Sequence, residues 1–297
     1  METELWPNLF AVCEANEVPI VLANVRLSAR STRGYRLIGA LSKEMLARVR
    51  VVAAQSQADA TRLLSLGMNP EHVQVTGSVK FDLNLPASLR EQAQVLRREL
   101  GIDRSIFIAA STHDGEDAQV LQAFTHVLRA IPRCLLVLVP RHPERFADAA
   151  ALCRKRGFNI ALRSKPTTNL ADVDVYLGDS MGELPLLYAA SDIAFVGGSL
   201  VPTGGHNMLE PAALGLPVLF GPYVFNFSEI SRMLMHVGAA WQVDDARALG
   251  ERAQALLEDA NLRHNVGDAG RQFVLSNRGA LSKLVTLIDE QIAATNA

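Results

Sequence analysis

The sequence has few cysteines, little net charge and no long apolar run. Each of these features argues against a class of protein: disulfide-rich, nucleic-acid-binding or membrane-spanning. Cys13, Cys134 and Cys153 are odd in number and show no CxxC or histidine-paired spacing, so we expect reduced thiols rather than a disulfide framework or a metal site. The net charge of −2 gives no general reason to expect nucleic acid as a partner. No apolar run approaches the ~20 residues of a membrane-spanning helix. What remains is a globular chain, and its 297 residues favour two domains.

Short β-rich runs alternate with amphipathic stretches, a pattern typical of parallel sheets built from βαβ units. The first part predicts helices at 35–47 and 57–66, and a charged helical stretch over 86–100 follows it. We therefore expect an α/β protein with two Rossmann-like domains, of which the N-terminal one holds only half a sheet. The predicted strands are 20–25, 49–54 and 73–77 in the first part, then 105–111, 134–140, 159–163, 173–178, 193–198, 217–221 and 239–243, before three terminal helices.

The domain boundaries predicted from this pattern divide the chain into four parts. They are a partial N-terminal domain over 1–85, a connector helix over 86–100, a C-terminal domain over 101–277, and a terminal helix over 278–297 that we expect to pack back on the N-terminal domain.

Four polar segments each follow a predicted strand and lead into a predicted helix. Ligands of open α/β sheets bind at the carboxyl ends of the strands, where free helix N–H groups attract anions. Each segment also has a simpler explanation: Ser111 and Thr112 could cap a helix, Arg141 and His142 could pair with Glu144, and Glu183 could be an ordinary first-turn acid. The segments are "ASTHDGED" at 110–117, "PRHPERF" at 140–146, "GDSMGEL" at 178–184 and "FVGGSLVPTGGHNMLEPAALGLPVLFGP" at 195–222.

The last of these segments is the most informative, because it places glycines beside a carboxylate. Gly204 and Gly205 permit positive φ, and the glycines would let the backbone approach a phosphate or a sugar acid. His206 and Asn207 can donate hydrogen bonds, while Glu210 can accept from two vicinal hydroxyls, as acids do from ribose. We expect a ligand site here rather than a plain tight turn.

Two patterns that could suggest other functions do not fit. The acids of "DVD" at 172–174 resemble a metal-binding pair, but they open a strand at the end where ligands do not bind. "GGSLVPTGG" is not GxGxxG and comes late in the second sheet, so a dehydrogenase is not favoured.

The stretch between Val18 and Ala58 is basic: it contains seven Lys and Arg residues and a single acid, Glu44. It is either a solvated helix face or a contact for phosphates on a substrate or a membrane surface. Its members are Arg26, Arg30, Arg33, Arg36, Lys43, Arg48 and Arg50.

Eight strings in this order resemble the Kdo transferases, which add 3-deoxy-D-manno-octulosonic acid (Kdo) to the lipid A precursor in lipopolysaccharide synthesis. The resemblance implies the two-domain GT-B fold and transfer of Kdo from CMP-Kdo to lipid IVA with inversion, without a metal or cofactor. It also implies that the enzyme acts at the cytoplasmic face of the inner membrane and that its N-terminal domain binds the acceptor. The strings are "METELWPN", "ANVRLSARS", "VTGSVKFD", "STHDGE", "PRHPERF", "GDSMGEL", "FVGGSLVPTGGHNMLEPAA" and "GPYVFNF".

The resemblance also assigns roles to particular residues. It implies that Glu2 and Lys80 stabilise the transition state. The residues it implies for binding CMP are Pro140, Arg141, Met181, Gly182, Glu183, Asn207, Met208, Leu209 and Glu210. To these the strand-end argument adds Ser111, Thr112, His113 and Gly205 as substrate-binding residues.

Members of the family carry a further segment ahead of "METELWPN", with a membrane anchor, half of the acceptor domain and a glutamate that acts as general base. We therefore expect these 297 residues to bind the donor but to transfer Kdo only when that segment is supplied. Two alternatives stay open: a nucleotide-binding remnant without activity, and a GT-B enzyme that uses a UDP-sugar.

Overall fold

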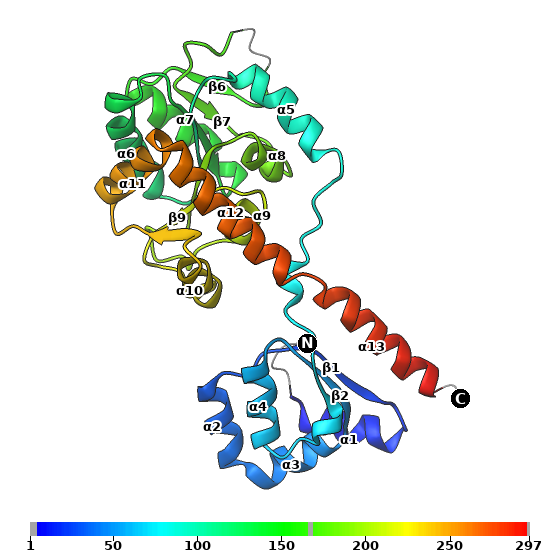
Figure 1. Ribbon diagram of the computed structural model, residues 1–297. Coiled ribbons are helices and arrows are strands. Elements are labelled where there is room, and N and C mark those ends of the chain that lie inside the picture. The colour runs from blue at the N-terminus through cyan, green and yellow to red at the C-terminus, as the bar shows by residue number, and fades with distance from the viewer. Residues whose placement is uncertain (1–4, 166–168, 296–297) are drawn as a thin grey trace. The chain divides into compact units, whose positions relative to one another are not determined.

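The computed structural model describes residues 5–165 and 169–295 and consists of two compact units (Figure 1). Unit 1 comprises Met1–Leu83 together with Ser276–Ala297, and unit 2 comprises Asn84–Leu275. The first and last parts of the chain therefore fold into one body.

Unit 1 is built on a parallel sheet of three strands in the order β1-β2-β3, with β1 at Ile20–Val25, β2 at Val49–Ala54 and β3 at Val73–Val75. Side chains of β2 alternate between two apolar clusters. Val52 and Ala54 pack with Met45 and Leu63, whereas Val51 and Ala53 pack with Leu284 and Leu287 of α13. The helices are α1 (Pro7–Ala15), α2 (Ala29–Leu37), α3 (Gly39–Ala47), α4 (Gln57–Ser65), η1 (Pro70–His72), η2 (Val79–Phe81) and α13 (Ala280–Thr295).

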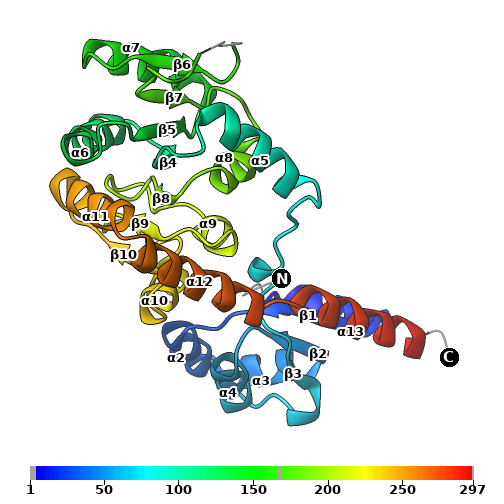
Figure 2. The same ribbon diagram turned by 45° about the horizontal axis from the view of Figure 1, so that its top comes forward.

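Unit 2 is built on a parallel sheet of seven strands in the order β10-β9-β8-β4-β5-β7-β6, with helices on both faces (Figure 2). The strands are β4 (Ile106–Thr112), β5 (Leu135–Pro140), β6 (Ile160–Leu162), β7 (Val175–Leu177), β8 (Ile193–Val196), β9 (Val218–Phe220) and β10 (Ala240–Gln242). The helices are α5 (Leu89–Leu100), α6 (Glu116–Ala130), η3 (Pro143–Arg145), α7 (Phe146–Lys155), α8 (Leu184–Ala189), α9 (Leu209–Ala213), α10 (Ser228–His236), α11 (Ala246–Glu258) and α12 (Ala260–Ser276).

The continuous apolar strands of unit 2 serve two cores, one on each face of the sheet. Phe107 packs with Phe124 of α6 and Leu249 of α11 on one face. Ile108 packs with Leu96 of α5 and Leu187 of α8 on the other. Because both faces are covered, the strands show no alternation of polar and apolar residues, as expected for a parallel sheet.

Two predicted elements differ from the structure. The helix predicted over 35–47 is two helices, because the backbone leaves the helical region at Ile38 (φ −105°, ψ 39°), and the first begins earlier, where Ser28 Oγ accepts from Ser31 N. The predicted connector over 86–100 forms α5, which belongs to unit 2. Its buried Leu89, Leu96 and Leu100 follow the helical period and hold it against the sheet and α8.

The cysteines that the structure describes are free thiols, and Cys134 and Cys153 are buried. Burial raises the pKa of each of these two thiols to about 12. A pKa this high favours the protonated, unreactive form of both thiols at neutral pH.

We predict that Asp82 fastens α13 to unit 1. Its Oδ1 accepts from Gly279 N at 2.6 Å and its Oδ2 from Leu281 N at 2.7 Å, so it satisfies two free N–H groups at the start of the helix. Asp82→Ala should lower the free energy of unfolding of unit 1 by about 1–2 kcal/mol. It should also speed amide hydrogen exchange in α13.

Asp245→Ala is the matched control, because Asp245 Oδ1 caps α11 of unit 2 by accepting from Ala248 N at 2.8 Å. It should leave exchange in α13 unchanged. Equal exchange in α13 for Asp82→Ala and the unsubstituted chain would contradict the assignment.

Candidate functional site

The four polar segments singled out in the sequence lie side by side in unit 2. They follow β8, β4, β5 and β7, which are consecutive strands of one parallel sheet, so all four leave it at its carboxyl edge. From β4 the chain continues to β5 on one side, while β8 lies on the other. Open α/β sheets bind ligands at the carboxyl edge where strand order reverses in this way. The carboxyl edge at β4 and β8 is therefore the candidate site.

One buried carboxylate joins the loop after β4 to the loop after β8. Glu116 is 0% exposed, and its Oε2 accepts from His113 N at 2.9 Å and from Gly198 N at 2.6 Å. Its Oε1 accepts from Ser199 N at 2.9 Å and Leu200 N at 2.8 Å. Four backbone N–H groups thus compensate the buried charge and fix the β8 loop against the β4 loop. Glu116 was not among the site residues predicted from the sequence, although it is the last residue of "STHDGE".

Three histidines gather above this junction, one from each of three neighbouring strand ends. The Nε2 atoms of His113 and His206 lie 2.7 Å apart, and the two rings lie end to end in nearly one plane, with an interplanar angle of 10° and centroids 5.0 Å apart. The His142 ring meets the His113 ring edge-on at 5.3 Å. Burial, followed by the nearby His113, Arg141 and His142, lowers the pKa of His206 to about 4. Burial also lowers the pKa of His113, with Glu116 opposing the shift. Both rings are therefore neutral at pH 7.

Glycines in the loops after β8 and β9 make close contacts within the chain, so a ligand is not needed to explain their presence. A Cβ on Gly197 would stand 2.6 Å from Ser111 O, and one on Gly221 would stand 2.2 Å from Ser199 O. Gly204 and Gly205 do have positive φ, of 102° and 77°, but they pack against residues of the loop after β9. At these positions it is the protein's own backbone or side chains that approach closely.

Asn207 orders the start of α9 and the carboxylate that follows it. Its Oδ1 accepts from Leu209 N and its Nδ2 donates to Glu210 Oε1, each at 3.1 Å. Glu210 remains partly exposed, as a ligand-binding acid must be. The side chains of Met208 and Leu209 are 0% exposed, so a ligand could meet these two residues only through their backbone.

The segment after β7 carries an ion pair that the sequence did not reveal. Arg163 donates from Nη2 to Glu183 Oε1 at 2.7 Å and from Nε to both carboxylate oxygens at 3.2 Å. The hydrogen bonds from Arg163 hold the pKa of Glu183 below its usual range. Glu183 is thus already paired, while its neighbour Met181 is 61% exposed and Gly182 takes φ 82°.

The β4 and β5 ends meet at the carbonyl of Thr112, which accepts from Arg141 N at 3.0 Å and from Arg145 Nη1 at 3.1 Å. Arg145 also pairs through its Nη2 with Asp117 Oδ2 at 2.5 Å. Ser111, with φ 56°, and Thr112 do not cap α6, whose start at Gly115 has no side-chain cap. The alternative capping role is therefore wrong.

Pro140 is the last residue of β5, and Arg141 beside it is exposed. The described residues show no ion pair between Glu144 and either Arg141 or His142, which was the simpler explanation of this segment. The guanidinium of Arg141 can thus meet a ligand.

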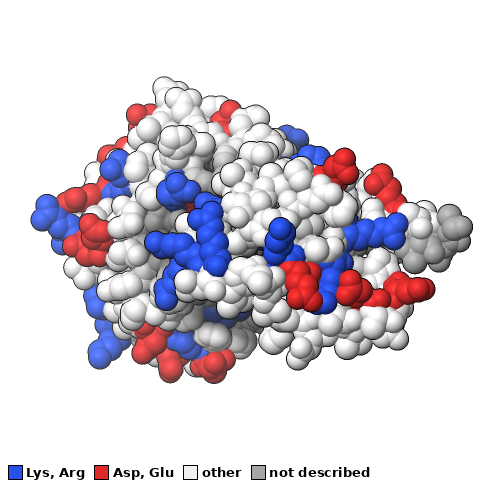
Figure 3. All heavy atoms as spheres, turned by 90° about the horizontal axis from the view of Figure 1, so that it is seen from below, with Lys and Arg blue, Asp and Glu red and all other residues white. Residues whose placement is uncertain are grey.

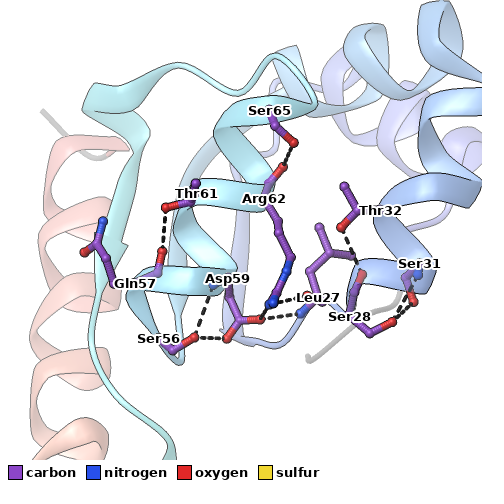
Figure 4. Close-up of polar contacts among 10 residues, drawn as sticks. All are labelled: Leu27, Ser28, Ser31, Thr32, Ser56, Gln57, Asp59, Thr61, Arg62 and Ser65. Atoms are coloured by element: carbon purple, nitrogen blue, oxygen red, sulfur yellow. Dashed lines mark hydrogen bonds and ion pairs between the residues drawn. The ribbon is translucent and has the colours of Figure 1, made fainter.

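In unit 1 the strand ends are also tied together by polar contacts (Figure 4). The buried Asp59 accepts from Leu27 N at 2.9 Å and from Ser56 Oγ at 2.5 Å. Asn24 Oδ1 accepts from Val79 N at 3.2 Å and so holds η2, which carries Lys80. Glu2, the other residue assigned to the transition state, lies outside the described residues.

Among residues 5–165 and 169–295, no group of three His, Cys, Asp or Glu side chains is placed to hold a metal ion. In the same part of the chain, no helix is both long enough and apolar enough to cross a membrane.

Two α/β units built on parallel sheets, with polar loops at the carboxyl edge of one of them, are typical of the GT-B architecture of glycosyltransferases. Residues 104–273 match the family model of glycosyl transferases group 1, and residues 1–83 match that of 3-deoxy-D-manno-octulosonic-acid transferase (kdotransferase). Over 97% of its length the chain is 45% identical to the 3-deoxy-D-manno-octulosonic acid transferase of Haemophilus influenzae, of which it covers 68%. The chain belongs to this family of Kdo transferases.

Further relatives and solved structures agree with this assignment. The Bordetella pertussis 3-deoxy-D-manno-octulosonic acid transferase is 38% identical over 98% of this chain and 68% of its own length. The C-terminal CMP-Kdo binding domain of WaaA from Acinetobacter baumannii matches 64% of this chain and 99% of its own, with 35% identity and a TM-score of 0.61. Anabaena HepE in complex with UDP matches 97% and 76%, with a TM-score of 0.53, but its 14% identity supports the fold alone.

We predict that Glu116→Gln lowers the free energy of unfolding of unit 2 by about 1–3 kcal/mol, because an amide –NH₂ would face N–H donors that now have an acceptor. Amide exchange of Gly198–Leu200 should rise more than exchange in β5. Chemical denaturation and hydrogen exchange measure the two effects.

Glu258→Gln provides the control, since Glu258 is an exposed acid of α11. It should change stability by less than about 0.5 kcal/mol. A Glu116→Gln protein as stable as this control would show that the buried carboxylate does not hold the loops.

Proposed function

We propose that the protein is an inverting glycosyltransferase that moves Kdo from CMP-Kdo to a hydroxyl of the lipid A precursor in lipopolysaccharide synthesis. Unit 2 binds the donor through the loops after β4, β5, β7 and β8, and unit 1 contributes to acceptor binding. The reaction needs no metal ion and no cofactor.

One observation carries the proposal. The residues that the family resemblance assigns to CMP stand at the ends of the parallel strands β5, β7 and β8, and the strand-end argument adds residues at the end of β4, which lies between β8 and β5 where strand order reverses. In addition, the chain resembles over 64% of its length the solved C-terminal CMP-Kdo binding domain of WaaA from Acinetobacter baumannii. Sheet geometry and family assignment therefore support the same edge of the same unit.

The chemistry of the transfer fits the groups at this edge. The bond between the anomeric carbon of Kdo and the phosphate oxygen breaks, and its electron pair stays on CMP. The acceptor oxygen bonds to the anomeric carbon and its proton leaves to a base. Negative charge thus grows on the phosphate in the transition state, where a fixed cation is most effective. The exposed Arg141 is such a cation in unit 2, and Lys80 takes the corresponding role in unit 1.

We predict that Glu210 binds the ribose of CMP. Glu210→Gln should weaken CMP binding by about 1–3 kcal/mol, because a neutral amide loses the charge-assisted hydrogen bonds to the hydroxyls. Calorimetric titration of CMP measures the change, and titration of UDP in parallel separates a CMP-Kdo enzyme from one that uses a UDP-sugar. Kdo transfer to lipid IVA, followed by mass spectrometry, tests the complete reaction.

Glu258→Gln should bind CMP as the unsubstituted chain does. Unchanged CMP affinity in Glu210→Gln would remove this acid from the site, and tighter binding of UDP than of CMP would favour the UDP-sugar alternative. Robust transfer by these 297 residues would show that an acid within them, such as Glu2 or Glu4, can serve as the base.

A basic surface of unit 1 supports a place for the enzyme at an anionic membrane surface. Arg30, Arg33 and Arg36 are all exposed on α2, and the last residue of this helix, Leu37 (89%), and Ile38 after it are exposed apolar residues. Figure 3 shows blue Lys and Arg side chains gathered beside neutral surface on the face turned to the viewer. Cations next to exposed apolar side chains suit a bilayer interface better than they suit a purely solvated helix.

We predict that the chain binds vesicles containing anionic phospholipid and that binding falls steeply as salt rises. Arg30→Gln with Arg33→Gln should flatten this salt dependence, since each lost cation removes about 1 kcal/mol of attraction. Vesicle sedimentation measures the bound fraction. Arg129→Gln with Arg133→Gln, which removes two cations of unit 2, serves as the control. Binding that ignores both salt and substitution would leave the basic stretch as a solvated face.

A further inference from the structure

The imidazoles of His113 and His206 form a bond that limits how many protons they can hold. With their Nε2 atoms 2.7 Å apart, one ring donates its N–H and the other accepts. The accepting ring then carries its proton on Nδ1, and the donating ring has an unprotonated Nδ1. One further proton can bind at that Nδ1 without breaking the shared bond. A second would place two N–H groups face to face, so the pair can take up one proton and resists the next.

The rings are held in this arrangement by their surroundings rather than by chance. His113 N is bound to Glu116, and the same carboxylate holds Gly198 N at 2.6 Å. The His206 ring lies directly over Gly198, where a Cβ would stand 3.0 Å from its Cδ2 atom. Glu116 therefore fixes the two loops, and through them the rings.

Burial, and after it the charges that face the pair, favour the neutral form of both rings. Arg141, Arg145 and His142 come from the β5 end and disfavour a further positive charge. Glu116 of α6 favours a further positive charge on the pair, but four backbone N–H groups already compensate its own negative charge. Asp117 of the same helix is paired with Arg145. A dianion that enters this edge would reverse the balance.

We propose that His113 and His206 form a phosphate-binding pair that takes up one proton from solvent when a phosphate monoester binds at the carboxyl edge of unit 2. This inference rests on the proposed function, because CMP is the monoester that the transfer would leave behind. The added proton converts the pair to a cation with its shared hydrogen bond intact. The pair would thus offset the second negative charge that the phosphate gains when Kdo departs.

The test measures protons and imidazoles directly. At pH 7.5 the phosphate of CMP is almost fully dianionic. A proton taken up from solvent on binding must therefore be bound by a group of the protein. Calorimetry in two buffers of different ionisation enthalpy should show uptake of about half to one proton per CMP, and none with cytidine. ¹⁵N NMR of the imidazoles should show the Nδ1 atom of one ring of the pair becoming protonated. Inorganic phosphate alone should cause the same change at higher concentration.

His113→Gln combined with His206→Gln should abolish the uptake, because neither amide can gain a proton. His113→Asn combined with His206→Asn is the second variant if the first does not fold. His264→Gln, an exposed histidine of α12, should leave the uptake unchanged.

The outcomes separate the two proposals. Imidazole protonation by phosphate without any CMP binding would sustain the pair and remove the CMP-Kdo function. CMP binding with no proton uptake and unchanged imidazole signals would overturn the pair and leave the function standing. The pair is also overturned if neither CMP nor phosphate changes the imidazoles.

Discussion

The carboxylate of Glu116 is the contact on which the candidate site depends. It is fully buried and satisfied by four backbone N–H groups from two loops that are far apart in the sequence. A buried charge is tolerated only when such donors compensate it, so the loops must keep one relative position for the unit to be stable. The site geometry is thereby tied to the stability of the fold.

The order of the strands does the rest of the positioning. Because β8, β4, β5 and β7 are parallel neighbours, segments from four parts of unit 2 reach one edge without any long connection. The arginines at this edge are then used in different ways. Arg145 and Arg163 pair with acids of the chain itself, whereas Arg141 bonds through its backbone and keeps its guanidinium exposed. The first two order the loops, and the third is left to meet a ligand.

The two units differ in how they complete their layers. In unit 2 the helices that cover the sheet come from the same continuous part of the chain. In unit 1, one face of β2 is covered by Leu284 and Leu287, more than 200 residues further along. The Asp82 carboxylate at the start of α13 strengthens this return of the chain.

The sequence by itself determined the α/β class, all strands of both sheets within a few residues, and the polar segments at their ends. It could do so because long apolar runs bounded by turn residues have few other solutions. It also supplied the family, through irregular strings that no periodicity produces. The sequence did not show which acids form an ion pair within the chain. Glu183 and Glu210 look alike in the sequence, yet Glu183 pairs with Arg163, which follows β6, whereas Glu210 accepts only from the Asn207 amide in the described contacts. Nor did it distinguish glycines that meet a ligand from glycines that meet Ser111 or Ser199. Those contacts join residues distant in the chain, and only the register and order of the strands decide which of them meet.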